Sequence, residues 1–145
     1  MFLGQYEHTI DEKGRMIIPA RYRDLLQDGA FITLGFDHNS MVLTAAAFDK
    51  VRDRVSAMSL TDPIARDLRR KMFSKADRVE IDRAGRVLIS QFLREEASLQ
   101  GAAVVVGAGD YFEIWAPEYW DKKDEDLNGS DANDQRYATF DLSLR

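Results

Sequence analysis

Cysteine is missing from this chain of 145 residues, and histidine occurs only twice. Without cysteine there can be no disulfide and no thiolate metal site, a composition that fits a reducing compartment. Two histidines alone form no credible zinc-binding set. We expect His8 to pack within a strand and His38 to lie in a polar turn. Neither a metal nor another cofactor is therefore expected.

Long apolar runs are also missing. No segment approaches the roughly 20 apolar residues that a membrane-spanning helix requires. Residues 1–4 lack the basic region and the apolar run of a signal peptide. We therefore expect a soluble, cytoplasmic protein with no membrane partner. The hydrophobic content of 45% is enough for the core of one compact domain.

The formal net charge of −5 argues at first against a nucleic-acid partner. The acids, however, are concentrated at the end of the chain, where residues 117–145 hold eight acids and four bases. Bases gather instead around two turns and along residues 66–78. A local patch governs attraction to phosphates, because charges farther apart than about 8 Å are screened.

One short pattern, D-x-x-G-R, occurs twice, at residues 11–15 and 82–86. The similarity continues beyond these turns: residues 16–18 correspond to 87–89, and residues 29–35 correspond to 101–107. A repeat that keeps both its polar turn and its strand pattern is one structural unit used twice. We predict two pseudo-symmetric halves that face each other, each with a copy of the same surface turn.

The hydrophobic pattern predicts the same order of elements in each half. Strands are expected at residues 5–10, 15–18, 31–36, 41–45, 78–82, 86–90, 102–108 and 111–116, and helices at 20–26, 47–58, 63–74, 91–98 and from 117 onward. Gly14 is expected in the left-handed region, in the loop of a short hairpin. Ser90 occupies the position of Pro19 in the second half, where we expect a looser start to the helix.

At this point the motifs resemble those of a known family. The opening M-F-L-G followed by Y-E-H, the first turn followed by I-P, the second D-R-x-G-R turn and F-E-I-W at residues 112–115 are together similar to the MraZ family. The resemblance covers about residues 1–120. It implies an α+β fold: a swapped-hairpin β-barrel of the AbrB/SpoVT type, built from two pseudo-symmetric repeats with flanking helices. We expect a first AbrB-like repeat at 1–60, a helical connector at 61–76, a second repeat at 77–120 and an acidic tail at 121–145, with the repeats forming one compact domain.

The same resemblance implies a bacterial regulator of transcription associated with the nucleoid. Such a protein would assemble into a homo-oligomeric ring and bind double-stranded DNA at short direct repeats upstream of the division and cell-wall gene cluster. No small-molecule substrate is expected. The family's D-x-x-x-R residues carry over to Asp11 and Arg15 in the first half, and to Asp82 and Arg86 in the second.

The two turns suit a role in DNA recognition. A two-stranded ribbon fits the major groove, and the planar fork of arginine matches guanine or phosphate. The expected DNA-binding residues are Arg15, Arg86, Lys13 and Arg83, and the residues expected to brace the turns are Asp11, Gly14, Asp82 and Gly85. The basic run at 66–78 is more typical of a solvated helix face.

Two other classes of function remain open. Asp11 and Asp82 could form a dyad of carboxylates that share a proton, but each is flanked by bases and opens a turn. The sequence therefore favours a protein that is not an enzyme. A ring-forming structural or antitoxin-like module without its own DNA specificity is the main alternative to a regulator, and the salt dependence of retention on DNA would separate the two.

Overall fold

The computed structural model describes residues 1–129 and 135–144. The first half contains β1 (Gln5–Thr9), β2 (Arg15–Ile17), α1 (Ala20–Arg23), the 3-10 turn η1 (Asp24–Leu26), β3 (Ala30–Leu34), β4 (Ser40–Thr44), α2 (Ala45–Ser56) and α3 (Pro63–Phe73). The second half contains β5 (Asp77–Val79), β6 (Arg86–Leu88), α4 (Gln91–Glu96), β7 (Ala102–Gly107), β8 (Tyr111–Trp115) and α5 (Pro117–Asn128). The repeated order of strand, turn, strand, short helix and two strands is confirmed.

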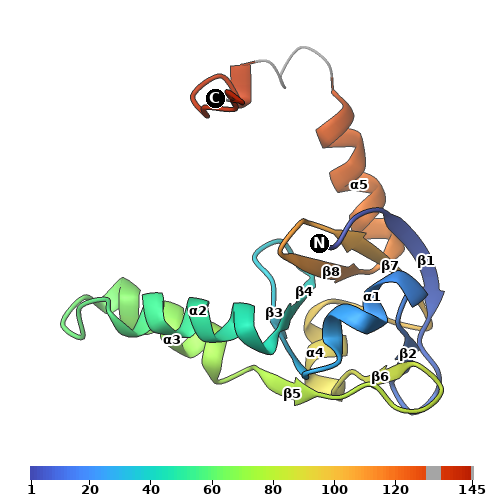
Figure 1. Ribbon diagram of the computed structural model, residues 1–145. Coiled ribbons are helices and arrows are strands. Elements are labelled where there is room, and N and C mark those ends of the chain that lie inside the picture. The colour runs from blue at the N-terminus through green and yellow to red at the C-terminus, as the bar shows by residue number, and fades with distance from the viewer. Residues whose placement is uncertain (130–134, 145) are drawn as a thin grey trace.

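Strands from the two halves pair with each other. A six-stranded sheet has the order β1-β7-β8-β4-β3-β5, and a separate two-stranded ribbon is formed by β2 and β6. The first strand of each half therefore pairs with the other half: β1 lies antiparallel to β7, and β5 lies antiparallel to β3. Figure 1 shows β2 and β6 crossing the same side of the molecule. The two repeats form one interleaved α+β structure.

This exchange corrects the expectation of a short local hairpin at the first turn. Among the described residues, the two sides of that turn are linked by an isolated bridge between Ile10 and Met16 and not by a strand ladder. Beyond it the strands separate, β1 toward β7 and β2 toward β6. The separation allows side chains on both strands to enter the common core, where Ile10 is 7% exposed and Met16 is fully buried. In the described residues, the strands fall into these two sheets rather than one closed ring.

The main core is also shared between the halves. Met16 and Ile18 from the first half and Val87 and Ile89 from the second are each at most 2% exposed, and they belong to the same cluster. Removing such side chains from water contributes about 25 cal/mol for each Å² of apolar surface. Each half therefore buries part of its hydrophobic face against the other.

The short helices that follow the ribbon strands begin differently in the two halves. α1 has Pro19 at its N-cap and no side-chain cap, whereas the Ser90 hydroxyl accepts a hydrogen bond from the Leu93 N–H at 3.3 Å. The expected loosening at Ser90 is therefore wrong, because serine satisfies an otherwise free N–H group. The predicted helix at 20–26 is also divided, since α1 ends at Arg23 and η1 continues the turn.

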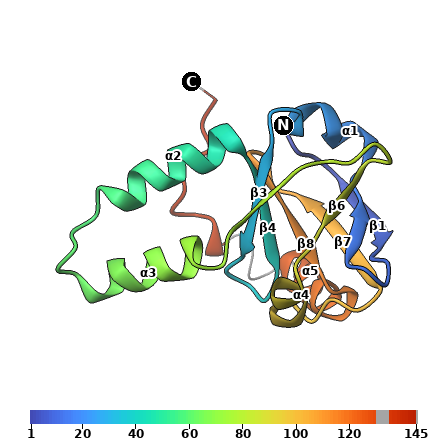
Figure 2. The same cartoon turned by 90° about the horizontal axis from the view of Figure 1, so that it is seen from below.

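The helices α2 and α3 form an arm that projects from the sheet (Figures 1 and 2). Thr44 caps α2 by accepting from the Ala47 N–H at 3.1 Å, and Asp62 caps α3 by accepting from the Ile64 N–H at 2.9 Å. The base of the arm is fixed by apolar contacts, including a stack of Phe31 on α2's Phe48 with ring centroids 4.2 Å apart.

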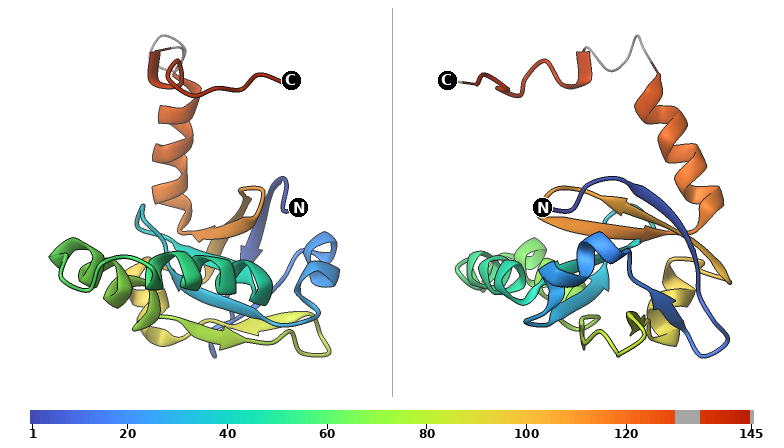
Figure 3. Two further views of the ribbon diagram at one scale, coloured as in Figure 1. Left: turned by 60° about the vertical axis from the view of Figure 1, so that its left-hand side comes forward. Right: turned by 45° about the vertical axis from the view of Figure 1, so that its right-hand side comes forward.

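The last helix, α5, leaves the body on the side away from the β2–β6 ribbon (Figures 1 and 3). Its base is held by Trp120, which packs edge-on against Trp115 with ring centroids 5.4 Å apart. Part of the expected acidic tail, residues 130–134 and 145, lies outside the described residues. Within the part of the chain that the structure describes, no helix is both long and apolar enough to cross a membrane.

Candidate nucleic-acid interface

The first D-x-x-G-R turn is organised by its aspartate. Asp11 Oδ1 accepts hydrogen bonds from the backbone N–H groups of Lys13 and Arg15, both at 2.9 Å. Its other oxygen, Oδ2, accepts from Arg15 Nε at 2.8 Å. The Asp11 N–H also donates to the Arg15 carbonyl at 2.8 Å, which closes the loop. One carboxylate therefore fixes both the backbone of the turn and the direction of its arginine.

The second turn repeats these contacts. Asp82 Oδ1 accepts from the N–H groups of Ala84 and Arg86, both at 2.9 Å, and Oδ2 accepts from Arg86 Nε at 2.9 Å. The Asp82 N–H donates to the Arg86 carbonyl at 2.9 Å. The duplicated pattern of the sequence thus becomes a duplicated geometry.

Both aspartates stay charged more readily than an ordinary carboxyl group. Hydrogen bonds from the backbone N–H groups of Arg15 and Arg86 are the main cause that lowers the pKa of Asp11 and Asp82, respectively. The arginine side chains lower these pKa values further. Each pair is solvent-exposed, so its main effect is to orient the guanidinium and its contribution to stability is small.

The two turns are joined by the β2–β6 ribbon. Its strands are antiparallel, with Arg15 opposite Leu88, Met16 opposite Val87, and Ile17 opposite Arg86. Backbone hydrogen bonds extend the pairing at both ends: the Ile18 N–H donates to the Gly85 carbonyl and the Ile89 N–H donates to the Gly14 carbonyl, each at 2.8 Å. Each turn is therefore anchored to the strand that leaves the other turn.

A second pair of arginines, Arg23 and Arg94, supports the turns from beneath. Arg94 Nε donates to the Ile89 carbonyl at 3.0 Å, and its guanidinium lies against Gly14 of the other half. Arg23 Nε donates in the same way to the Ile18 carbonyl at 3.1 Å and lies against Gly85. We did not identify either residue from the sequence, although their separation of 71 positions was an available signal.

The turn glycines are needed for two reasons. Gly14 and Gly85 have φ angles of +84° and +80°, which residues with a Cβ rarely adopt. A Cβ on Gly14 would lie 2.8 Å from the Ile89 carbonyl oxygen and 2.8 Å from Arg94 Nε. A Cβ on Gly85 would lie 2.6 Å from Arg23 Cζ. A side chain at Gly14 would meet a fixed backbone oxygen, and one at Gly85 would require the Arg23 guanidinium to shift.

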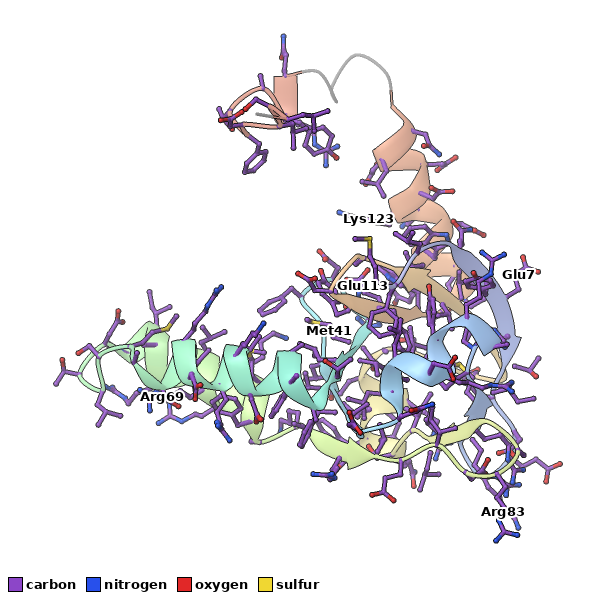
Figure 4. All side chains as sticks on the ribbon, viewed as in Figure 1. Glu7, Met41, Arg69, Arg83, Glu113 and Lys123 are labelled. Carbon is purple, nitrogen blue, oxygen red and sulfur yellow. The ribbon has the colours of Figure 1, made fainter. Side chains whose placement is uncertain are left out.

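Within the described residues, each motif arginine uses only its Nε as a side-chain donor. The side chains of Arg15 and Arg86 are 33% and 32% exposed, and each uses Nε for its aspartate. No acceptor for their Nη groups lies among residues 1–129 and 135–144. Lys13 and Arg83 are exposed beside them. Figure 4 shows Arg83 extending from the end of its turn, far from the arm that carries Arg69.

The two turns differ in charge. The inner positions of the first turn hold Glu12 and Lys13, and the corresponding positions of the second hold Arg83 and Ala84. All four side chains are exposed. The second turn is therefore the more positive of the two.

Comparison with known proteins identifies the family. A family model described as "MraZ protein, putative antitoxin-like" matches this chain twice, at residues 1–71 and 72–141. The chain belongs to the MraZ family. The double match agrees with the duplication seen in the sequence and in the fold.

Three relatives carry the name "Transcriptional regulator MraZ". The protein of Roseiflexus castenholzii is 44% identical over 145 residues, which cover 100% of this chain and 99% of the relative. That of Herpetosiphon aurantiacus is 42% identical over 120 residues, or 83% and 84% of the two chains. That of Dictyoglomus thermophilum is 40% identical over 128 residues, or 88% of each. Because the MraZ family is one of transcriptional regulators, the expectation that this chain is not an enzyme is confirmed.

The geometry of the aspartates agrees with that assignment. Carboxylates that share a proton have at least one raised pKa, whereas the pKa values of Asp11 and Asp82 are both lowered and each group is held by its own arginine. In the described part of this MraZ family member, no cluster of three or more potential metal ligands occurs. His8 is half-buried on β1, and burial followed by the charge of Arg23 lowers its pKa.

Several bases in the run at 66–78 have structural partners within the protein. Arg69 Nη2 donates to the Ser56 and Met58 carbonyls at 3.1 and 2.8 Å, which holds α3 against the end of α2. Lys71 Nζ donates to the Gly35 carbonyl at 2.7 Å. Arg70 pairs with Asp67 at 3.0 Å. These contacts account for part of the basic run without a nucleic-acid partner.

Proposed function

We propose that this chain is a sequence-specific, DNA-binding regulator of transcription. It would bind short direct repeats upstream of the division and cell-wall gene cluster. It would be located in the cytoplasm, associated with the nucleoid. The observation that carries the proposal is the pair of motif arginines, each oriented by an aspartate and each with unused Nη donors on one ribbon. Two donors on a planar fork match the paired acceptors of guanine in the major groove.

The proposed contacts divide into two kinds. Arg15 and Arg86, which are held in fixed directions, would read base edges or grip phosphates with bidentate geometry. Lys13 and Arg83, whose side chains are exposed, would add phosphate contacts. Asp11, Gly14, Asp82 and Gly85 would hold the turns in the shape that these contacts require.

The turns need a rigid support for this role. We infer that the six-stranded sheet and the β2–β6 ribbon act as the two parts of a swapped-hairpin β-barrel of the AbrB/SpoVT type. The shared core and the exchanged strands support this arrangement. A rigid support fixes the separation of the two turns, so both can reach the same duplex together.

Assembly into a homo-oligomeric ring completes the proposal. One subunit carries only a few positive side chains on a body whose net charge is −5, so its own affinity for DNA would be low. Closed cyclic symmetry would present many copies of the turns to repeated sites and raise the affinity through multivalency. Light scattering should detect a species several times 16.6 kDa. A strict monomer that binds one isolated site tightly would contradict the ring.

Salt dependence tests the proposal against a ring-forming or antitoxin-like scaffold. We expect the full-length protein to shift a duplex from upstream of its own gene. The logarithm of its affinity should fall with the logarithm of salt concentration, by about 0.9 for each neutralised phosphate. A protein that fails to bind this duplex, or whose binding does not change with salt, would favour the scaffold.

A further inference from the structure

We propose that Ile17 and Leu88 read the methyl groups of thymine, so that they determine sequence specificity beside the motif arginines. This inference rests on the proposed DNA-binding function and names a second chemical feature that the same ribbon would recognise. The supporting observation is a pair of exposed aliphatic side chains on the outer face of β2 and β6.

The ribbon has two distinct faces. Met16 and Val87 lie opposite each other and are 0% and 2% exposed, so they point into the core. Because side chains alternate along a strand, their neighbours point outward. Ile17 and Leu88 are 47% and 57% exposed.

The outward face combines charged and apolar groups in a regular order. Arg15 lies directly opposite Leu88, and Ile17 lies directly opposite Arg86. The two arginines therefore occupy one diagonal of a four-residue square, and the two aliphatic side chains occupy the other. Each aliphatic group lies beside an arginine whose direction is set by an aspartate.

This order matches the chemistry of the major groove. The thymine methyl is the apolar group that the groove presents, beside the donors and acceptors that arginine can read. Residues two positions apart on a strand are separated by about 6.7 Å, which is close to two base-pair steps of about 3.4 Å each. An arginine and the aliphatic residue on the same strand could therefore contact bases two steps apart.

A second copy of this chain is a poorer occupant of the same face. Two ribbons packed against each other would bring Arg15 and Arg86 of one copy close to the same arginines of the other. Their Nη groups would lose water and gain no acceptor from the facing arginines, and charged donors that are buried in this way are strongly unfavourable. A DNA duplex, in contrast, offers negative charge to the two arginines and methyl groups to the two aliphatic side chains.

The test replaces thymine by deoxyuridine, which lacks only the methyl group. A duplex from upstream of the protein's own gene is prepared with either base, and the dissociation constant of each is measured with the full-length protein. Each buried methyl group should strengthen binding about four-fold. We expect the natural protein to bind the deoxyuridine duplex at least about four-fold more weakly.

The variant Ile17→Ala/Leu88→Ala separates methyl contact from a change in DNA shape. It should bind the thymine duplex more weakly and should not distinguish the two duplexes, whereas an effect of DNA shape would persist in the variant. The control Leu60→Ala/Ile64→Ala removes two aliphatic side chains that are 67% and 79% exposed. It should retain the natural preference for thymine.

The outcomes distinguish this inference from the proposed function. If the natural protein binds neither duplex, the DNA-binding function itself fails. If it binds both equally, the inference is overturned while DNA binding stands. If Ile17→Ala/Leu88→Ala changes the number of subunits measured by light scattering, the two side chains are a subunit contact and the inference is again overturned. If the variant does not fold, equal binding of the two duplexes by the natural protein still overturns the inference.

Discussion

At the scale of single residues, the turns combine a backbone constraint with a packing constraint. Gly14 has a φ angle of +84°, and the Ile89 carbonyl and Arg94 Nε fill the space where a Cβ would lie. Gly101 has a similar φ angle of +75°, but nothing lies within 4 Å of the position of its Cβ. Substitutions at Gly14 and Gly101 therefore separate the strain of the left-handed backbone from the clash of a Cβ with neighbouring atoms.

We predict that Gly14→Ala destabilises the fold more than Gly101→Ala. The substitution at Gly101 carries only the strain of the left-handed conformation, about 1–2 kcal/mol. The substitution at Gly14 adds a clash with a backbone oxygen, for a further loss of at least about 1 kcal/mol. Urea unfolding measures the loss of unfolding free energy in each variant. The protein concentration must be the same throughout, because assembly makes the apparent stability depend on concentration. Equal losses at the two positions would show that the packing at Gly14 does not matter.

At the scale of elements, the sequence predicted local structure better than strand pairing. The bounds of the turns and longer helices depend on nearby groups, such as the carboxylate of Asp11 or the Asp62–Pro63 start of α3. Pairing of β2 with β6 joins distant positions, such as Met16 and Val87, and no local pattern specifies it without the resemblance to a known fold. Arg23 and Arg94 were missed for the same reason, because their role depends on a turn in the other half.

We predict that the supporting arginines act across the two halves. Arg94→Met removes the guanidinium that packs on Gly14, so amide hydrogen exchange should become faster in the first turn, residues 11–15. Arg23→Met should have the same effect on the second turn, residues 82–86. Arg21→Met, at an exposed position of α1, is the control and should change neither turn. Faster exchange confined to the half that carries the substitution would contradict this account.

We also predict that the charge of the first turn limits the affinity for DNA. Glu12 lies where the second turn has Arg83, so Glu12→Gln should remove a repulsion with phosphate and strengthen binding severalfold. The gain should shrink as salt rises, because screening weakens the repulsion that was removed. Glu125→Gln, an exposed position on α5 away from the ribbon, should leave the affinity unchanged. An equal gain from both variants would mean that net charge matters and the position in the turn does not.

At the scale of the whole molecule, the acidic side chains of α5 lie on the opposite side of the body from the proposed DNA-binding turns (Figure 1). The acidic helix α5 leaves the body away from the ribbon, and the two D-x-x-G-R turns with their basic side chains extend on the other side (Figures 3 and 4). A polyanion can therefore approach the ribbon without passing the acids of α5. The duplication also places two copies of the motif on one structure whose halves share a core.

The affinity of Arg15→Ala/Arg86→Ala for a duplex from upstream of the protein's own gene tests the central proposal most directly. Each lost contact should cost roughly 1–3 kcal/mol, and the loss would be repeated in every subunit of a ring. Arg70→Ala, which removes an exposed arginine paired with Asp67 on the arm, is the matched control and should bind like the natural protein. We expect the double variant to keep its circular dichroism spectrum and its assembly but to bind far more weakly, with a shallower salt dependence. Natural affinity in a double variant of unchanged assembly would contradict it.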